Sequence, residues 1–114
     1  MKEFIRVMKA LSDPSRVKII KMLQHKRMCV CEMKEALGIA QPSVSKHLKI
    51  LEDAGLVECQ KDGQWANYYL SDGRKSPYVS SLMGNLRHWL EKEPGIEGLL
   101  KKIPHIRREE VCGK

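Results

Sequence analysis

Two cysteines separated by one residue, Cys29 and Cys31, carry the most distinctive chemistry in this sequence. Their thiolates are soft ligands, which select thiophilic ions and disfavour hard ones. Within a continuous helix, residues two apart point to nearly opposite sides, so the two thiols could not converge there. At the start of a helix, with Cys29 still extended, both thiols can face one point. The pair therefore predicts a site for trivalent arsenic or antimony, or for cadmium, lead or copper(I).

Two further cysteines, Cys59 and Cys112, lie elsewhere in the chain. Cys112 falls in a C-terminal tail that we expect to be mobile, so it is a candidate third ligand beside Cys29 and Cys31. Cys59 falls in a predicted strand, where a solitary cysteine is the simpler interpretation. The N-terminus has no apolar run long enough for a signal peptide, which predicts a cytoplasmic protein. Structural disulfides are rare in that compartment.

Other interpretations of the cysteines stay open at this point. Cys29 and Cys31 could be small buried apolar residues, since cysteine is often buried. They could form a redox or persulfide switch, in which oxidation replaces ligand binding. A thiol enzyme would need an activated nucleophile with a paired base, and the sequence offers no such constellation, so we expect no enzyme. A constitutive architectural DNA-binding protein would leave the cysteines without a role.

A predicted helix over residues 41–54 presents a polar face suited to nucleic acid. Its buried stripe is Val44, Leu48 and Leu51, which turns its polar residues outward. Polar and basic side chains at the N-terminal end of such a helix can read base edges in a major groove. The chain has 21 Lys and Arg against 14 Asp and Glu, a formal charge of +7 that favours a polyanionic partner. The candidate DNA-binding residues on this helix are Gln41, Ser43, Ser45, Lys46, His47 and Lys49.

His47 lies closer to the buried stripe of the helix than Lys46 does. A packing or positioning role is therefore as well supported for His47 as a base contact. Strand-forming residues at 56–59 and 65–70 flank Asp62-Gly63, a strong hairpin-turn signal. This hairpin is a wing, from which Lys61 and Gln64 can reach the DNA backbone.

Short helices are predicted in the part of the sequence that precedes this wing. Apolar spacing gives a first helix from Phe4 to Leu11, and Asp13 can cap a second that ends near His25. A third ends at Gly38, and the short link to residue 41 has the spacing of a helix-turn-helix. A final long helix carries an apolar face from residue 78 to residue 90. The expected fold is mainly α with a β-hairpin, a winged helix-turn-helix over residues 1–92, followed by a C-terminal tail over 93–114.

Apolar faces at opposite ends of the chain predict a homodimer. A chain of this length is too short to cover the first and last helices by itself. No apolar stretch approaches the length that spans a bilayer, so we expect no membrane partner. The predicted dimer-interface residues are Phe4, Ile5, Met8, Leu11, Leu82, Leu86 and Trp89.

Four segments resemble the ArsR/SmtB family of arsenical- and metal-responsive repressors, and in particular its arsenical-responsive branch. They are residues 10–16, 28–33, 41–48 and 61–65, with the tyrosines that follow, and the likeness spans roughly residues 4–90. The resemblance implies a homodimer packed through its first and last helices. It also implies that the ligand-free form binds an inverted-repeat operator in double-stranded DNA, and that a trivalent arsenical or a similar inducer releases it.

The sequence departs from the family pattern at two positions. Arsenic-responsive members often carry a third cysteine three residues after the second, where this chain has Lys34. Two thiolates suffice for a trivalent arsenic that already carries one organic substituent, but inorganic arsenite needs a third ligand. The family often has a serine cap where Ala40 stands, a loss of about 1 kcal/mol at the helix end. Zinc-type ligand pairs of other members are not matched by His88 and Glu91, so we expect no zinc site there.

Overall fold

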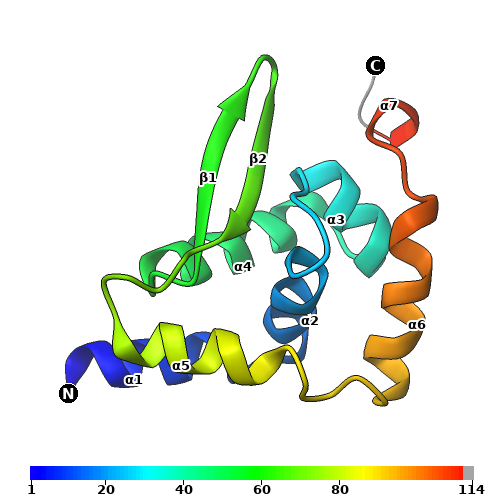
Figure 1. Ribbon diagram of the computed structural model, residues 1–114. Coiled ribbons are helices and arrows are strands. Elements are labelled where there is room, and N and C mark those ends of the chain that lie inside the picture. The colour runs from blue at the N-terminus through cyan, green and yellow to red at the C-terminus, as the bar shows by residue number, and fades with distance from the viewer. Residues whose placement is uncertain (112–114) are drawn as a thin grey trace.

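The computed structural model describes residues 1–111, in which short helices surround one core and a hairpin projects from them (Figure 1). No helix in this described part is long and apolar enough to cross a membrane. The elements are α1 (Lys2–Ala10), α2 (Pro14–Leu23), α3 (Val30–Leu37), α4 (Gln41–Asp53), β1 (Val57–Asp62), β2 (Trp65–Leu70), α5 (Pro77–Leu86), α6 (Pro94–Lys102), a 3₁₀ turn (Ile103–His105) and α7 (Arg108–Val111).

Local signals in the sequence set the ends of α2, α3 and α4. The side chain of Asp13 accepts a hydrogen bond from the Arg16 amide at 3.1 Å, and Pro14 opens α2 where no amide hydrogen is needed. Gly38 ends α3 in the left-handed conformation with φ of 69°. The predicted helix-turn-helix of α3 and α4 is therefore confirmed, and these two helices pack against each other.

The core lies between α2, α4 and the start of the wing. Val44, Leu48 and Leu51 are buried on α4, as the stripe predicted. On α2 the buried set is wider than predicted, because Ile19 and Met22 join Ile20 and Leu23. Val17, which was expected to point inward, is only partly buried. A two-sided burial of α2 follows from its central position in Figure 1, with other helices on more than one side.

The wing is an antiparallel hairpin whose turn lies one residue later than predicted. The register pairs Asp62 with Trp65, so Gly63 and Gln64 are the two loop residues rather than Asp62 and Gly63. Gly63 has φ of 65°, the positive value that the first position of such a two-residue loop requires. β1 therefore begins one residue later than expected and runs on to Asp62, β2 has the expected bounds, and Gln64 lies at the tip of the wing.

The predicted long final helix is wrong in its length, because α5 ends at Leu86. Lys21 of α2 is fully buried, and its ammonium donates to the carbonyls of Leu86 (2.6 Å) and Trp89 (2.9 Å). In a continuing helix the Leu86 carbonyl would instead accept from the amide of Leu90. Leu90 has a left-handed φ of 66°, which a helix cannot include.

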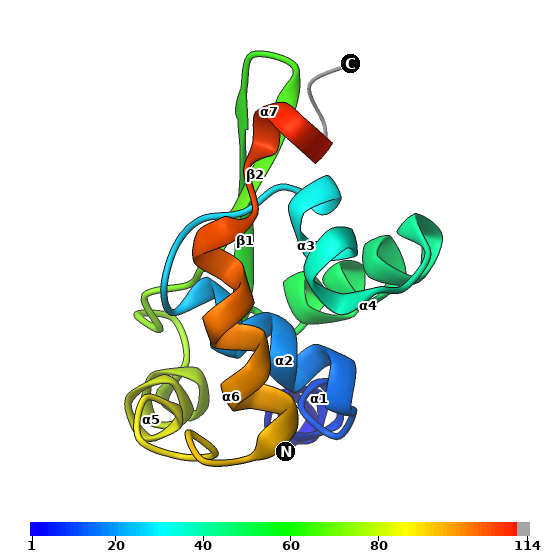
Figure 2. The same cartoon turned by 90° about the vertical axis from the view of Figure 1, so that its right-hand side faces the viewer.

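Residues 94–111 are not a mobile tail, which corrects the sequence-based description of this segment. Helix α6 packs on α2 and α3, and its Ile96 and Leu99 are buried together with Ile103 and Ile106 beyond it. Figure 2 shows α6 rising along α2 toward α3, and α7 beyond it packs on α3. The C-terminal segment therefore brings distant residues to the middle of the molecule.

Candidate functional site

Cys29 and Cys31 lie at the N-terminus of α3, with their thiols close to each other. Cys29 is the N-cap residue and has extended backbone angles, φ −95° and ψ 171°, whereas Cys31 is already inside the helix. This is the geometry that allows thiols two residues apart to face the same side. Cys29 is buried and Cys31 partly exposed, so a ligand would approach from the side of Cys31.

The ionisation of Cys31 reflects this neighbourhood. Burial raises the pKa of the Cys31 thiol, and Cys29 raises it further through its charge and a hydrogen bond between the two side chains. A local backbone hydrogen bond and the Lys34 ammonium lower the pKa of Cys31 in opposition. Lys34 stands one turn along α3, so it acts on this site by its charge.

Glu32 fixes the backbone of the cysteine pair. Its carboxylate Oε1 accepts the amide of Cys29 at 2.9 Å, while the Cys29 side chain accepts the Glu32 amide, which makes a capping box. Glu32 is itself buried and lies 3.6 Å from the Lys26 ammonium and 3.7 Å from the Arg108 guanidinium. The start of α3 is therefore held by a buried carboxylate with two cationic neighbours.

The residue before Cys29 joins this site to the wing. Met28 forms a β-bridge with Tyr68 of β2, with hydrogen bonds of 3.2 Å and 2.8 Å in the two directions. Cys59 lies opposite Tyr68 in the hairpin. Burial first, and then the charge and hydrogen bond of Cys59, raise the pKa of Tyr68 to about 12. Cys59 thus interacts with Tyr68 within the wing.

No three of the His, Cys, Asp and Glu side chains in the described part of the chain meet closely enough to hold a metal ion. Cys59 therefore does not complete a cluster with Cys29 and Cys31. The candidate third ligand, Cys112, lies outside the described residues 1–111. The geometry of these residues is that of a two-thiol site.

The candidate DNA-binding residues of α4 lie largely in solvent. Gln41, Ser43, Ser45 and Lys46 are exposed, and no side chain caps the helix at Ala40. The Ser43 amide donates to the Ala40 carbonyl at 3.0 Å, and Pro42, just before Ser43, has no amide hydrogen. Few backbone donors therefore remain for a phosphate at this helix end, and side chains must supply most contacts.

His47 is held by Arg16 in the first turn of α2 and by Asp13, the cap of that helix. Its Nδ1 lies 3.2 Å from the Arg16 guanidinium and 3.9 Å from the Asp13 carboxylate. A guanidinium can only donate, so Nδ1 accepts from Arg16 and the ring proton belongs on Nε2. Arg16 also donates to the carbonyls of Ala10 (2.7 Å) and Lys9 (3.3 Å) at the end of α1. Of the two roles weighed for His47, this geometry favours positioning of α4.

Lys49 is exposed farther along α4 and forms an ion pair with Asp53 at 3.3 Å. On the wing, Lys61 and Gln64 are both exposed. Lys61 pairs with Ala66, so it lies on the hairpin face opposite to Trp65 and the other odd-numbered residues of β2.

That second face of the wing is covered by arginines from outside the hairpin. The Arg27 guanidinium stacks 4.2 Å from the ring centroid of Tyr69, and Arg108 lies 4.7 Å from that of Trp65. Arg27 also donates to Gln60 at 3.0 Å, and Arg108 donates to Asn67. The wing therefore carries Lys61 on one face, and Arg27 and Arg108 from outside the hairpin pack on the other.

The predicted interface residues gather on α1 and α5, which lie side by side at the base of Figure 1. Phe4, Ile5 and Trp89 are exposed, and Phe4 makes an edge-to-face contact with Tyr78 at 5.3 Å. Leu86 needs correction, because it is 5% exposed and belongs to the core of the single chain. The remaining predicted interface residues, Met8, Leu11 and Leu82, are partly buried against the core.

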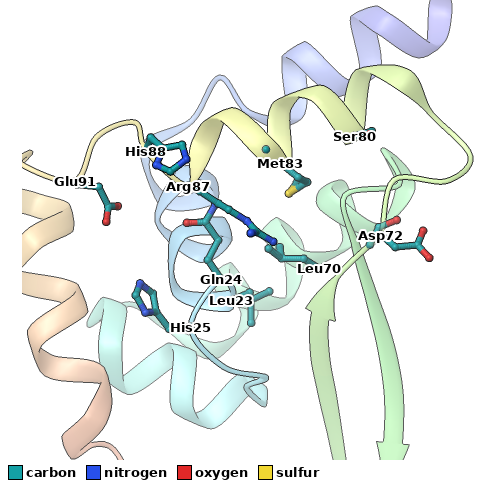
Figure 3. A pocket seen from close by; sticks show the side chains of 12 residues that line it. Leu23, Gln24, His25, Leu70, Asp72, Ser80, Met83, Arg87, His88 and Glu91 are labelled. Atoms are coloured by element: carbon teal, nitrogen blue, oxygen red, sulfur yellow. The ribbon is translucent and has the colours of Figure 1, made fainter.

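A pocket of about 930 Å³ lies between the end of α2, the residues after β2 and α5 (Figure 3). His88 and Glu91 line it together with His25 of the α2–α3 link. Glu91 forms an ion pair with Lys21, and that hydrogen bond is the main reason why the pKa of Glu91 is lowered. The Glu91 carboxylate is therefore already paired with the Lys21 ammonium, which binds the carbonyl at the end of α5.

In a comparison with known proteins, residues 13–58 match the model of the family described as bacterial regulatory protein, arsR family. An uncharacterized HTH-type transcriptional regulator of Methanocaldococcus jannaschii, MJ1325, is 44% identical over 69 residues, which are 60% of this chain and 78% of that protein. The chain belongs to the arsR family.

Two further relatives extend this assignment. The arsenical resistance operon repressor of Staphylococcus xylosus is 39% identical over 70 residues, which are 61% of this chain and 67% of that protein. Among solved structures, the homodimeric winged helix-turn-helix DNA-binding domain of Mb0332 from Mycobacterium bovis superposes with a TM-score of 0.65 at 26% identity. It covers 75% of this chain and 76% of that one.

Membership of the arsR family makes this chain a transcriptional regulator rather than an enzyme. The winged helix-turn-helix fold predicted from the sequence is confirmed by the same comparison and by α3, α4 and the hairpin. The matched residues 13–58 run from the cap of α2 into β1, so they contain both Cys29 and the exposed end of α4.

Reasoning from the sequence missed Glu32 and Arg108 beside the cysteine pair, and Lys21 at the end of α5. Glu32 carried a usable signal, since a glutamate three residues after a capping position is typical of a capping box. Lys21 and Arg108 had none, because both act through contacts with residues more than 40 positions away. Such contacts depend on the packing of α5 and α6.

Proposed function

We propose that this chain is a repressor that binds operator DNA as a ligand-free homodimer and is released when Cys29 and Cys31 bind trivalent arsenic. Antimony(III), cadmium and lead are the further inducers that this thiol chemistry suits. The observation that carries the proposal is the pair of adjacent thiols at the start of α3, the helix that packs on α4. Similarity to an arsenical resistance operon repressor supports the same inducer class.

Ligand binding at this pair is a substitution without electron transfer. A singly substituted arsenical, R–As(OH)₂, reacts with the thiols of Cys29 and Cys31 to form two As–S bonds while two As–OH bonds break. Each thiol proton leaves with a hydroxide as water, and the arsenic stays trivalent. The raised pKa of Cys31 means that this thiol brings its own proton to the leaving hydroxide at neutral pH.

Inorganic arsenite requires one ligand more. Lys34 carries an ammonium, which cannot replace a thiolate as a ligand. The third ligand is then a hydroxide that stays on the arsenic, or the Cys112 thiol, which would displace a third water. A site of two thiols therefore favours organic arsenicals over arsenite unless Cys112 takes part.

The DNA-binding side of the proposal rests on α4 and the wing. The exposed Gln41, Ser43, Ser45 and Lys46 would enter a major groove, with Lys49 beside them and His47 positioned from behind. Lys61 and Gln64 of the wing would contact the adjacent backbone. A dimer with these elements in each half fits an inverted-repeat operator in double-stranded DNA.

The test is a fluorescence-anisotropy titration of the protein on a labelled duplex selected from a random pool by the protein itself. Phenylarsine oxide, as the two-coordinate probe, should release wild type but neither Cys29→Ser nor Cys31→Ser, and both variants should keep ligand-free DNA binding. Cys59→Ser is the matched control and should respond as wild type does. Release of the Cys29/Cys31 double variant would place the site elsewhere and overturn the proposal.

Two further experiments test whether Cys112 is the third ligand and whether the cysteines form a redox switch instead. If Cys112 is the third ligand, Cys112→Ser should respond to phenylarsine oxide normally but less to arsenite. Release by hydrogen peroxide with metals chelated, and none by arsenicals under reducing conditions, would instead identify a thiol redox switch.

A further inference from the structure

We propose that Arg108 of α7 is a positioning residue that links the cysteine pair to the wing, so that inducer binding reaches DNA through the C-terminal segment. This inference rests on the proposed function, because it describes how a ligand at Cys29 and Cys31 changes the DNA-binding surface. The link has two parts, one on each side of Arg108, and both are contacts in the described structure.

The first part joins Arg108 to the cysteine pair through Glu32. One carboxylate oxygen, Oε1, accepts the Cys29 amide at 2.9 Å and lies 3.7 Å from the Arg108 guanidinium. Glu32 is buried, and Arg108 is only partly exposed, so water screens this ion pair little. A change in the position of Cys29 therefore moves the same oxygen that holds Arg108.

The second part joins Arg108 to the wing. Its guanidinium donates to the Asn67 side chain and stacks at 4.7 Å from the Trp65 ring centroid. Asn67 and Trp65 are alternate residues of β2, so they present one face to Arg108. Arg108 thus holds the outer half of the wing, while the Met28–Tyr68 bridge holds its middle.

Ligation at the cysteine pair disturbs the first part directly. The Cys29 side chain accepts the Glu32 amide in the capping box, and a sulfur that turns toward arsenic must leave that hydrogen bond. Because Oε1 of Glu32 is bound to the Cys29 amide, a displaced Cys29 shifts this oxygen away from Arg108, and the wing loses its support from α7. Arg108 would therefore keep the wing in its DNA-binding position in the ligand-free protein and release it when inducer binds.

Arg108→Gln removes the charge and the stacking, and Arg107→Gln is the matched control one residue away on an exposed position. Ligand-free Arg108→Gln should bind the selected operator about as weakly as wild type does with phenylarsine oxide. The ratio of operator Kd with and without the arsenical, expected at about 5–150-fold for wild type and Arg107→Gln, should fall toward one in Arg108→Gln. Phenylarsine oxide should bind Arg108→Gln at least as tightly as wild type, which a damaged cysteine site would not allow.

Glu32→Gln provides a second test that needs no arsenical. Its amide oxygen can still accept the Cys29 amide, but it has no charge for Arg108. Measured on operator affinity, the losses of Glu32→Gln and Arg108→Gln should not add, because each breaks the same link. Additive losses, or an Arg108→Gln protein that phenylarsine oxide releases as it does wild type, would overturn the link. If phenylarsine oxide reacts with two thiols of wild type but does not release it from DNA, the proposed inducer fails. The comparison of Glu32→Gln with Arg108→Gln still decides the link.

Discussion

Cys31 lies between two opposing influences on its ionisation. Burial and Cys29 raise the pKa of its thiol, and Lys34 lowers it. Cys29→Ala should therefore lower the pKa of Cys31, and Lys34→Gln should raise it further. The pH dependence of iodoacetamide modification at Cys31, followed by mass spectrometry, should shift to lower pH in the first variant and to higher pH in the second. Shifts in the same direction would show that one of the two groups is not close to the thiol in solution.

Gln41, Lys46 and Lys61 allow base contacts and backbone contacts to be distinguished. Gln41→Ala and Lys46→Ala should weaken binding to the selected operator more than to random duplex, because base contacts carry the sequence preference. Lys61→Ala should weaken both and reduce the slope of log K against log salt by about 0.9, as expected for one lost phosphate contact. Equal losses on both duplexes for all three variants would contradict the assignment of α4 as the reading helix.

At the scale of elements, Lys21 determines where α5 ends. Lys21→Met removes the ammonium and leaves the carbonyls of Leu86 and Trp89 without their donor. The expected loss is about 1–3 kcal/mol in the free energy of unfolding, the usual cost of unsatisfied buried polar groups. Urea denaturation measures it, with exposed Lys92→Met as the control. An unchanged midpoint would mean that the two carbonyls find other donors.

Glu91, the ion-pair partner of Lys21, makes the stability of the protein depend on pH in the acidic range. The Lys21 hydrogen bond lowers the pKa of Glu91 in the folded protein, so its contribution to stability is present above the unfolded pKa of about 4.3. That contribution is lost as the pH falls through the lowered, folded pKa. Wild type should therefore lose more stability on acidification than Glu91→Gln, when both are followed by thermal unfolding over the acidic range. Parallel acid profiles would contradict this.

The elements that the sequence predicted well are those whose ends are decided by neighbouring residues. Asp13, Gly38 and the apolar stripe of α4 act within a few positions, and the structure has α2, α3 and α4 almost where they were expected. The hairpin was shifted by one residue at its turn, because both Asp62-Gly63 and Gly63-Gln64 are compatible with a two-residue loop.

The elements predicted poorly are those whose ends depend on distant residues. Periodicity continued through Leu86 to Leu90, but Lys21, 65 positions earlier, takes the carbonyl at which α5 ends. The apolar residues of α6 looked like an irregular tail, since their partners on α2 and α3 are separated from them by the whole wing. For the candidate site, Cys29 and Cys31 were found from spacing, whereas Arg108 could be found only from the packing of α7.

At the scale of the whole molecule, the proposed ligand and DNA sites are joined by more than one path. Helix α3 connects the cysteine pair to α4 by packing, Met28 connects it to the wing through the backbone, and Arg108 connects it through side chains. By linkage, an inducer that weakens DNA binding must itself bind the DNA-free protein more tightly, by the same factor.

The exposed apolar face formed by α1 and α5 predicts that the chain forms a dimer. Phe4 and Ile5 on α1 and Trp89 just after α5 leave large apolar surfaces in solvent, and such patches are typical of protein interfaces. Wild type should sediment as a dimer at micromolar concentration. Ile5→Glu should sediment as a monomer, because a carboxylate buried in an apolar interface loses its hydration without gaining a partner.

The same substitution tests how the dimer uses its operator. A two-fold dimer places its half-sites about 34–36 Å apart, or a multiple of that, so shifting the spacing by half a helical turn should weaken wild type strongly. Ile5→Glu should bind more weakly overall and lose this dependence on spacing, because each monomer then contacts one half-site independently. Lys92→Glu, an exposed charge change outside the patch, should behave as wild type in both measurements. A wild-type monomer, or an Ile5→Glu protein that still distinguishes the two spacings, would show that the dimer is not built on this face.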